Sequence, residues 1–170
     1  VKTVVSDDGN VKVTSDYGNV RIGSNGADVR TVYAKGDIDV HVTEGVIQVQ
    51  GKTETAKGNI TMDAHNEKDV QNIVINQDGK LVSVQALTLH AYNGDIQVTG
   101  NTLAQRNLTV TIDNKGSVDF KKDVDVTGKV SATTKEGDIR IGETIDVGKE
   151  IVMTTGSGDI AVGEDVTSGT

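Results

Sequence analysis

Apolar and polar residues alternate in short segments along this chain, and the segments begin at regularly placed glycines. Counting each glycine as the first residue, the third and fifth residues are apolar except at Ser83, and the residue between them is mostly polar. Alternation with a period of two predicts strands with one face turned to a core. We therefore expect two inward-facing columns: Val11, Val20, Ile38, Ile60, Leu81, Ile96, Val118, Ile139 and Ile160, and Val13, Ile22, Val40, Met62, Ser83, Val98, Phe120, Ile141 and Val162.

A phrase of Gly, then Asp or Asn, then Ile or Val returns at intervals close to 21 residues. From Gly94 its glycines follow at steps of 22, 21 and 21 residues, ending at Gly158. A fixed period of this length is typical of solenoids. Each repeat divides into three short strands, for example 139–141, 145–147 and 151–155. The pattern predicts an all-β fold, a right-handed parallel β-helix with three short strands per turn of about 21 residues. About eight turns would stack at about 4.8 Å into a rod roughly 40 Å long.

The residue types suit this fold and disfavour helix. The chain has 20 Gly and no Pro, and Val and Ile fill most expected core positions. Glycine followed by Asp or Asn favours tight corners, and Pro within a central strand would remove a ladder hydrogen bond. No window shows sustained apolar spacing of three and four residues, so we expect little or no α-helix.

Three segments depart from the period. Segments 9–17 and 79–93 are short: the first is either a shortened turn or two strands of a preceding turn, and the second has lost a side. The most polar run, 63–72, predicts a loop that bulges from the rod before a strand resumes at Ile73. The repeat lacks a capping segment at either end, so we expect residues 1–170 to form one repeat segment, a fragment of a longer chain.

Composition and charge exclude several functions. Aromatic residues make up 2% of the chain, which leaves few side chains to line a deep pocket. The absence of Cys removes disulfides and thiolate chemistry, and a net charge of -8 disfavours nucleic acid as a partner. No apolar run approaches the length that spans a bilayer, so no membrane insertion is expected.

Carboxylates are numerous but are not grouped as a catalytic site requires. The outward column is expected to run Lys12, Arg21, Asp39, Thr61, Val82, Gln97, Asp119, Arg140 and Ala161, with no acids on adjacent turns. Arg21 with Asp39, and Asp119 with Arg140, are instead expected to pair across turns. We expect no catalytic residue and no enzyme.

Metal and cofactor sites are not predicted either. The corner column Asn19, Asp37, Asn59, Asp95, Asp138 and Asp159 fits turn formation better than calcium binding. His41, His65 and His90 share no spacing, which disfavours a zinc site. An ice-binding Thr array is also disfavoured, because Thr109 and Thr111, like Thr53 and Thr55, are expected to lack stacked neighbours.

Three phrases carry a resemblance to a known family: KGDIDV at 35–40, LTLHAYNGDI at 87–96 and EGDIRIG at 136–142. They resemble the repeat regions of filamentous haemagglutinin-like exoproteins, especially the leukotoxin-type filamentous adhesins of Gram-negative bacteria, and the resemblance covers essentially the whole chain. The phrases are also similar to bacterial adhesins with short Gly-Asp-Val/Ile repeats. The resemblance implies a long secreted β-helical shaft, exported through an outer-membrane partner, that holds adhesive regions away from the cell.

We therefore expect a structural shaft segment of an extracellular filament or filamentous adhesin at the bacterial cell surface, acting in adhesion or cell-to-cell contact. Its partners would be neighbouring repeats of the same chain, other copies in a filament, and a host or bacterial surface receptor. A carbohydrate- or protein-binding face near residues 65–70 is the alternative, and a polysaccharide-cleaving β-helix is a further one.

Overall fold

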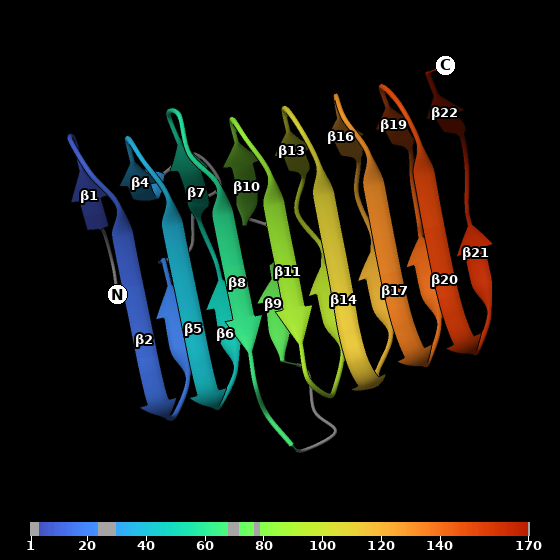
Figure 1. The fold of residues 1–170 in the computed structure, drawn as a ribbon, viewed down its shortest axis with the longest axis horizontal. Helices are drawn as coiled ribbons and strands as arrows, with labels where there is room; N and C mark the ends of the chain where they lie inside the picture. The colour runs from blue at the N-terminus through green and yellow to red at the C-terminus, as the bar shows by residue number, and fades with distance from the viewer. Residues whose placement is uncertain (1–3, 24–29, 68–71, 77–78, 170) are drawn as a thin grey trace.

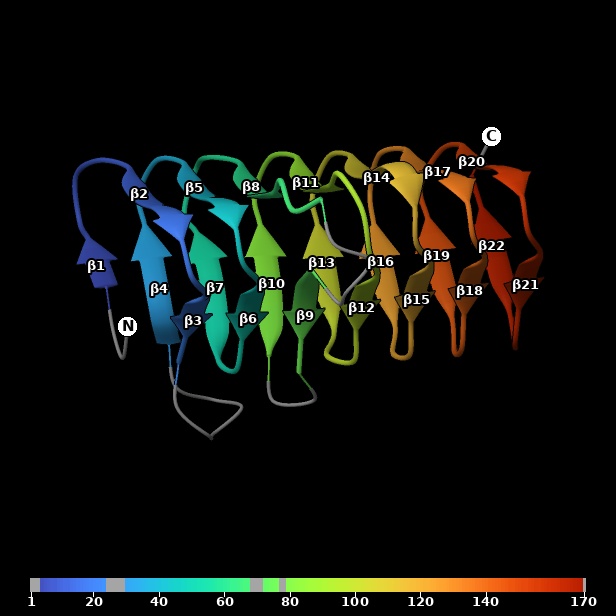
Figure 2. The same ribbon diagram turned by 90° about the horizontal axis from the view of Figure 1, so that it is seen from below.

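The chain winds into a three-sided parallel β-solenoid, as the repeat predicts (Figure 1). The computed structural model describes residues 4–23, 30–67, 72–76 and 79–169. Within these residues all strand pairs are parallel and no helix occurs. The three sheets run side by side along one axis, with the N-terminal strands at one end and the C-terminal strands at the other (Figure 2).

Each turn contributes one strand to each sheet. Sheet A contains β1 (Val4–Ser6), β4 (Arg30–Ala34), β7 (Lys52–Thr55), β10 (Lys80–Ser83), β13 (Thr102–Ala104), β16 (Val124–Val126), β19 (Ile145–Val147) and β22 (Val166–Ser168). Sheet B contains β2 (Val11–Tyr17), β5 (Ile38–Glu44), β8 (Ile60–Ala64), β11 (Leu87–Ala91), β14 (Leu108–Lys115), β17 (Val130–Glu136) and β20 (Ile151–Ser157). Sheet C contains β3 (Val20–Ile22), β6 (Ile47–Val49), β9 (Ile73–Ile75), β12 (Ile96–Val98), β15 (Val118–Phe120), β18 (Ile139–Ile141) and β21 (Ile160–Val162).

Turn length is regular only in the C-terminal part. In sheet B, Leu87 pairs with Leu108 and Leu108 with Val130, which are steps of 21 and 22 residues. Ile60 pairs with Leu87, a step of 27 residues, because the connections from β8 to β9 and from β9 to β10 are longer. The predicted period is therefore confirmed for the later turns, and additional residues at corners lengthen some earlier ones.

The core is a set of apolar columns that run the length of the rod. Ile38, Ile60, Ile96 and Ile139 are fully buried, and β-branched side chains of this shape fill the narrow interior. On the last turn the corresponding Ile160 is 46% exposed, because no further strand stacks on β21 within this chain. Stacking of one turn on the next therefore buries the core.

The predicted columns mix residues from different sheets. Val11, Ile38 and Ile60 belong to sheet B, Val20 and Ile96 through Ile160 to sheet C, and Leu81 to sheet A. The error arose because one glycine phrase serves two corners: Gly36 and Gly58 precede sheet B, whereas Gly94, Gly116, Gly137 and Gly158 precede sheet C. Segment 9–17 is thus the long strand β2, and segment 79–93 contains β10 and β11 of a three-stranded turn.

The strand register in the structure also gives ion pairs different from those predicted. Arg21 lies opposite Gln48 and donates from Nε to its Oε1 at 2.9 Å, whereas Asp39 lies in another sheet. Asp119 and Arg140 are neighbours as expected. However, Arg140 pairs with Asp138, and Lys121 lies 3.7 Å from Asp119.

The Asp and Asn residues of the repeat stack at two corners and bond one turn to the next. Before sheet B, Oδ1 of Asn10 accepts from the Asp37 amide, Oδ1 of Asp37 from the Asn59 amide and Oδ1 of Asn59 from the Ala86 amide, at 2.8, 2.8 and 3.1 Å. Before sheet C, Asp95, Ser117 and Asp138 accept in the same way from the next turn. These side chains therefore form corners, as predicted.

Glycine is required where successive corners touch. Gly137 has φ 139°, and a Cβ there would lie 2.1 Å from the carbonyl oxygen of Gly116 on the preceding turn. Only a residue without a side chain allows this approach without strain.

The predicted loop at 63–72 begins later than expected. Strand β8 includes Asp63 and Ala64, which pair with β11, so the connection starts at His65, and β9 begins at Ile73 as predicted. Residues 68–71 of that prediction lie outside the described part of the chain.

Candidate functional site

All three histidines of the chain gather at one part of sheet B. His41 of β5, Asp63 of β8 and His90 of β11 occupy one outward column, in register on consecutive turns. His65 follows two residues after Asp63, and Tyr92 two residues after His90. The histidines share no spacing in the sequence, as stated above, but the unequal turns bring them together in space.

Hydrogen bonds join four side chains across these turns, and we call them the His–Asp ladder: His41, Asp63, His90 and Asp113. Nδ1 of His41 lies 2.8 Å from Oδ2 of Asp63, and Nδ1 of His90 lies 2.7 Å from Oδ1 of the same carboxylate. Nε2 of His90 lies 3.0 Å from Oδ2 of Asp113. Both oxygens of Asp63 are thus engaged, and both ring nitrogens of His90 face carboxylates.

This geometry favours a charged His90. Burial of the ring disfavours the imidazolium, but hydrogen bonds to Asp63 and Asp113 and the charges of both carboxylates outweigh it, raising the pKa of His90 above its ordinary value of 6.5. A neutral imidazole could donate only one of the two bonds, whereas the protonated ring donates both. The ladder is therefore a set of charge-assisted hydrogen bonds that holds neighbouring turns together.

The edge of this region has an aromatic contact and a cavity. The rings of His65 and Tyr92 have centroids 4.5 Å apart. A cavity of about 430 Å³ is lined by Glu44, Gly45, Asn66 and Glu67. Nδ2 of Asn93 donates to the carbonyl oxygen of Glu67 at 2.9 Å, which fixes this part of the connection to the next turn.

Hydroxyl side chains continue the outer face of sheet B. They form two adjacent columns, Thr61, Thr88, Thr109 and Ser131, and Thr111, Thr133 and Thr154. Thr109 and Thr111 therefore have stacked neighbours, contrary to the prediction. Thr53 and Thr55 instead face the interior and are buried.

One sequence signal could have identified the ladder. His41, Asp63 and His90 each stand three residues after the first inward apolar residue of their strand, namely Ile38, Ile60 and Leu87. Separations of 22 and 27 residues conceal this relation unless the strands are aligned first. The unequal connection lengths account for the missed site.

The described residues contain no group of three or more His, Asp or Glu side chains arranged to hold a metal ion. No helix in this part of the chain could cross a bilayer.

The fold defines the class of the protein as a parallel β-solenoid of stacked, three-stranded turns. Comparison with protein-family models, with curated proteins and with solved structures found no match.

Proposed function

We propose that this chain is a structural shaft segment of a secreted bacterial surface filament or filamentous adhesin, acting in adhesion or cell-to-cell contact. The observation that carries the proposal is the continuity of bonding along the rod. Three parallel sheets connect each turn to the next, and the two corner ladders of Asp, Asn and Ser and the His–Asp ladder add side-chain bonds between some of the turns.

This bonding supports a mechanical role. Bending a rod with three sheets along one axis must stretch the inter-strand hydrogen bonds of one sheet while compressing another. Such a rod resists bending and holds its two ends apart. With eight strands in sheet A at about 4.8 Å spacing, this segment supplies roughly 35 Å of length.

The resemblance of the repeat phrases to filamentous exoproteins supports the extracellular location in the proposal. The partners it includes are further repeats of the parent chain, other copies in a filament, and a receptor on a host or bacterial surface. Immunogold electron microscopy with antibodies to this chain tests the location: fibres projecting from intact cells should be labelled. Label confined to the cell interior would contradict it.

A carbohydrate-binding module is the second candidate, favoured by the cavity whose lining residues Asn66 and Glu67 directly follow His65 of the His65–Tyr92 pair. Aromatic rings next to amide and carboxylate groups are suited to sugar rings and hydroxyls. A glycan array tests it: binding should disappear in Tyr92→Ala and persist in Tyr17→Ala, since Tyr17 is 81% exposed and lies on another turn. Glycan binding that survives Tyr92→Ala would refute this site.

We propose no catalytic role for the ladder carboxylates, because Asp63 and Asp113 are held by histidines. Release of reducing or unsaturated ends from acidic polysaccharides would contradict this part of the proposal.

A further inference from the structure

The outer face of sheet A changes character along the rod. Its outward column reads Val5, Tyr33, Glu54, Val82, Leu103, Asp125, Asp146 and Thr167 from the first strand to the last. The N-terminal half adds Lys52 and Lys80, which lie opposite each other on the paired strands β7 and β10. The C-terminal half adds Asp123 and Asp165, each two residues before an outward position.

The two halves therefore differ in charge. On β7 and β10 the charged side chains are Lys52, Glu54 and Lys80, with a Lys52 to Glu54 ion pair of 2.9 Å, which leaves one net positive charge. On and just before β16, β19 and β22 the charged side chains are Asp123, Asp125, Asp146 and Asp165, all exposed. Asp146 accepts a hydrogen bond from the neutral hydroxyl of Thr167.

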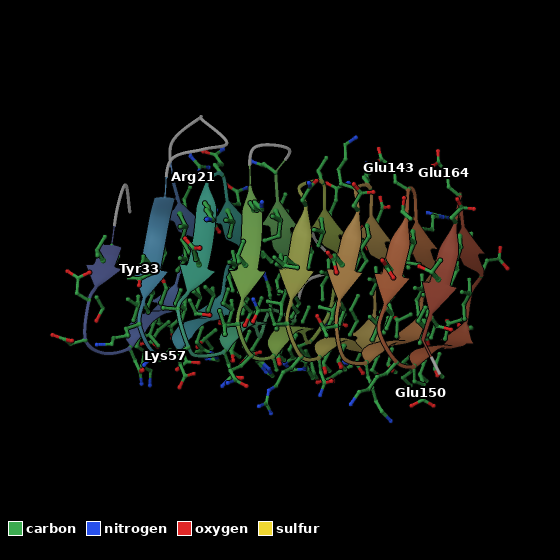
Figure 3. The ribbon with its side chains drawn as sticks, turned by 90° about the horizontal axis from the view of Figure 1, so that it is seen from above. Arg21, Tyr33, Lys57, Glu143, Glu150 and Glu164 are labelled. Carbon is green, nitrogen blue, oxygen red and sulfur yellow. The ribbon has the colours of Figure 1, made fainter. Side chains whose placement is uncertain are left out.

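The nearby lysines do not cancel the acidic half. Lys122 bonds to Glu143, and Lys121 lies beside Asp119 of sheet C. Glu143 lies in the corner before sheet A, and Glu143 and Glu164 follow one edge of the rod while Lys57 and Glu150 follow another (Figure 3). Lys122 is also attracted by Asp123, but Glu143 is its main partner, so the C-terminal half of sheet A keeps a net negative charge.

The middle of this face is apolar and hollow. Val82 of β10 and Leu103 of β13 are only partly buried. A hollow of about 220 Å³ crosses β10, β13 and β16, with Lys80 on one side and Asp123 and Asp125 on the other. Asn101, Thr102 and Leu103 lie between them. Opposite charges therefore flank an uncharged centre that contains Leu103.

We propose that a second copy of this chain docks on sheet A, antiparallel to the first, about a two-fold axis that runs along β13. That axis places β10 of each copy over β16 of the other, and β7 over β19. Lys80 then meets Asp123, with Asp125 beside it, and Leu103 of each copy lies at the centre. Glu54 of β7 lies over Asp146 of β19, and Lys52, which is paired with Glu54, lies beside these two carboxylates. A parallel arrangement would instead bring the four aspartates of one copy against those of the other.

A two-fold contact of this kind is self-complementary and closed, so it yields a dimer. Its charge pairs lie at the surface, which makes the association dependent on salt. The inference does not depend on the shaft role, because it concerns only the surface of sheet A.

Sedimentation velocity with paired charge reversals tests the proposal. The unmodified chain should dimerise at low ionic strength, and its apparent Kd should rise at least tenfold in high salt. Lys52→Glu with Lys80→Glu makes the face acidic throughout. Asp123→Lys, Asp125→Lys and Asp146→Lys together make the other half basic, because only Asp165 then stays negative. Each variant alone should be monomeric, and an equimolar mixture of the two should restore the dimer. Lys12→Glu on sheet B is the control and should leave the dimer unchanged.

Circular dichroism of each variant verifies folding. If either variant unfolds, the exposed single exchanges Lys80→Glu and Asp123→Lys replace both variants in the same mixing experiment. A chain that stays monomeric at low salt would overturn the proposal. So would dimers that persist in the separate variants, as end-to-end assembly would give, or folded variants whose mixture remains monomeric.

Discussion

His90 and Asp63 are 27 residues apart in the sequence, but Nδ1 of His90 lies 2.7 Å from Oδ1 of Asp63 on the neighbouring turn of the solenoid. Asp63 is shared between His90 and His41, so one carboxylate connects three successive strands of sheet B. We expect Asp63→Asn to lower the free energy of unfolding by about 1 kcal/mol at pH 6, since the charge-assisted bonds are lost at a partly exposed site. Urea denaturation measures the change. Asp39→Asn, in the adjacent outward column, is the control, and an equal loss there would contradict a specific role for the ladder.

The His–Asp ladder also predicts how stability depends on pH. The pKa of His90 is raised in the folded state, so its contribution is fully present below the unfolded pKa near 6.5 and is lost as pH rises through the folded value. The free energy of unfolding should therefore fall as pH increases above about 6.5. Subtracting the profile of His90→Gln isolates this contribution, because that variant should lack it. A difference between the two profiles that does not vary with pH would refute the assignment, as would an NMR titration in which His90 loses its proton below 6.5.

At two buried threonine positions, valine should give a more stable protein. Oγ1 of Thr53 and of Thr102 has no hydrogen-bond partner among the described residues, although both side chains are buried. We expect Thr53→Val and Thr102→Val each to raise the free energy of unfolding by about 1 kcal/mol. Thr134→Val is the matched comparison: Oγ1 of Thr134 donates to the carbonyl oxygen of Gly116 at 2.8 Å, so that variant should lose stability. Thermal unfolding distinguishes stabilisation from destabilisation. Destabilisation by all three substitutions would contradict the prediction for Thr53 and Thr102.

The corner ladder before sheet B is interrupted at Ala86. Asn59 accepts from the amide of Ala86, but alanine has no side-chain acceptor for Asn107 on the next turn. Ala86→Asn should restore the ladder and stabilise the fold by about 0.5 to 1 kcal/mol, whereas Asn59→Ala should destabilise it by a similar amount. Differential scanning calorimetry measures both changes. A lower Tm for Ala86→Asn would show that the ladder does not transfer to this position.

The fold could be predicted because each strand shows its period of two locally and the glycine phrase marks successive turns. Register could not, because the same phrase stands before sheet B at Gly36 and before sheet C at Gly94. The phrase stands at the corner before sheet B in early turns and at the corner before sheet C in later ones, so the phrase alone does not distinguish the two corners. The His–Asp ladder was missed for a related reason: the long connection between β8 and β9 shifts His90 relative to Asp63. A contact between turns depends on the sum of all connection lengths, which no local pattern contains.

Exchange of the shaft tests its proposed function most directly. The proposal implies a longer polypeptide displayed on cells that adhere to a surface. In such cells residues 1–170 are replaced by an unrelated β-solenoid of equal length, and adhesion to that surface is counted. Display is verified with an antibody to a part of the polypeptide outside the exchange. If this segment supplies length, the exchange should preserve adhesion, and simple deletion should reduce it. Loss of adhesion in the exchanged polypeptide, at unchanged display and length, would contradict the shaft account and assign binding to the surface of this segment.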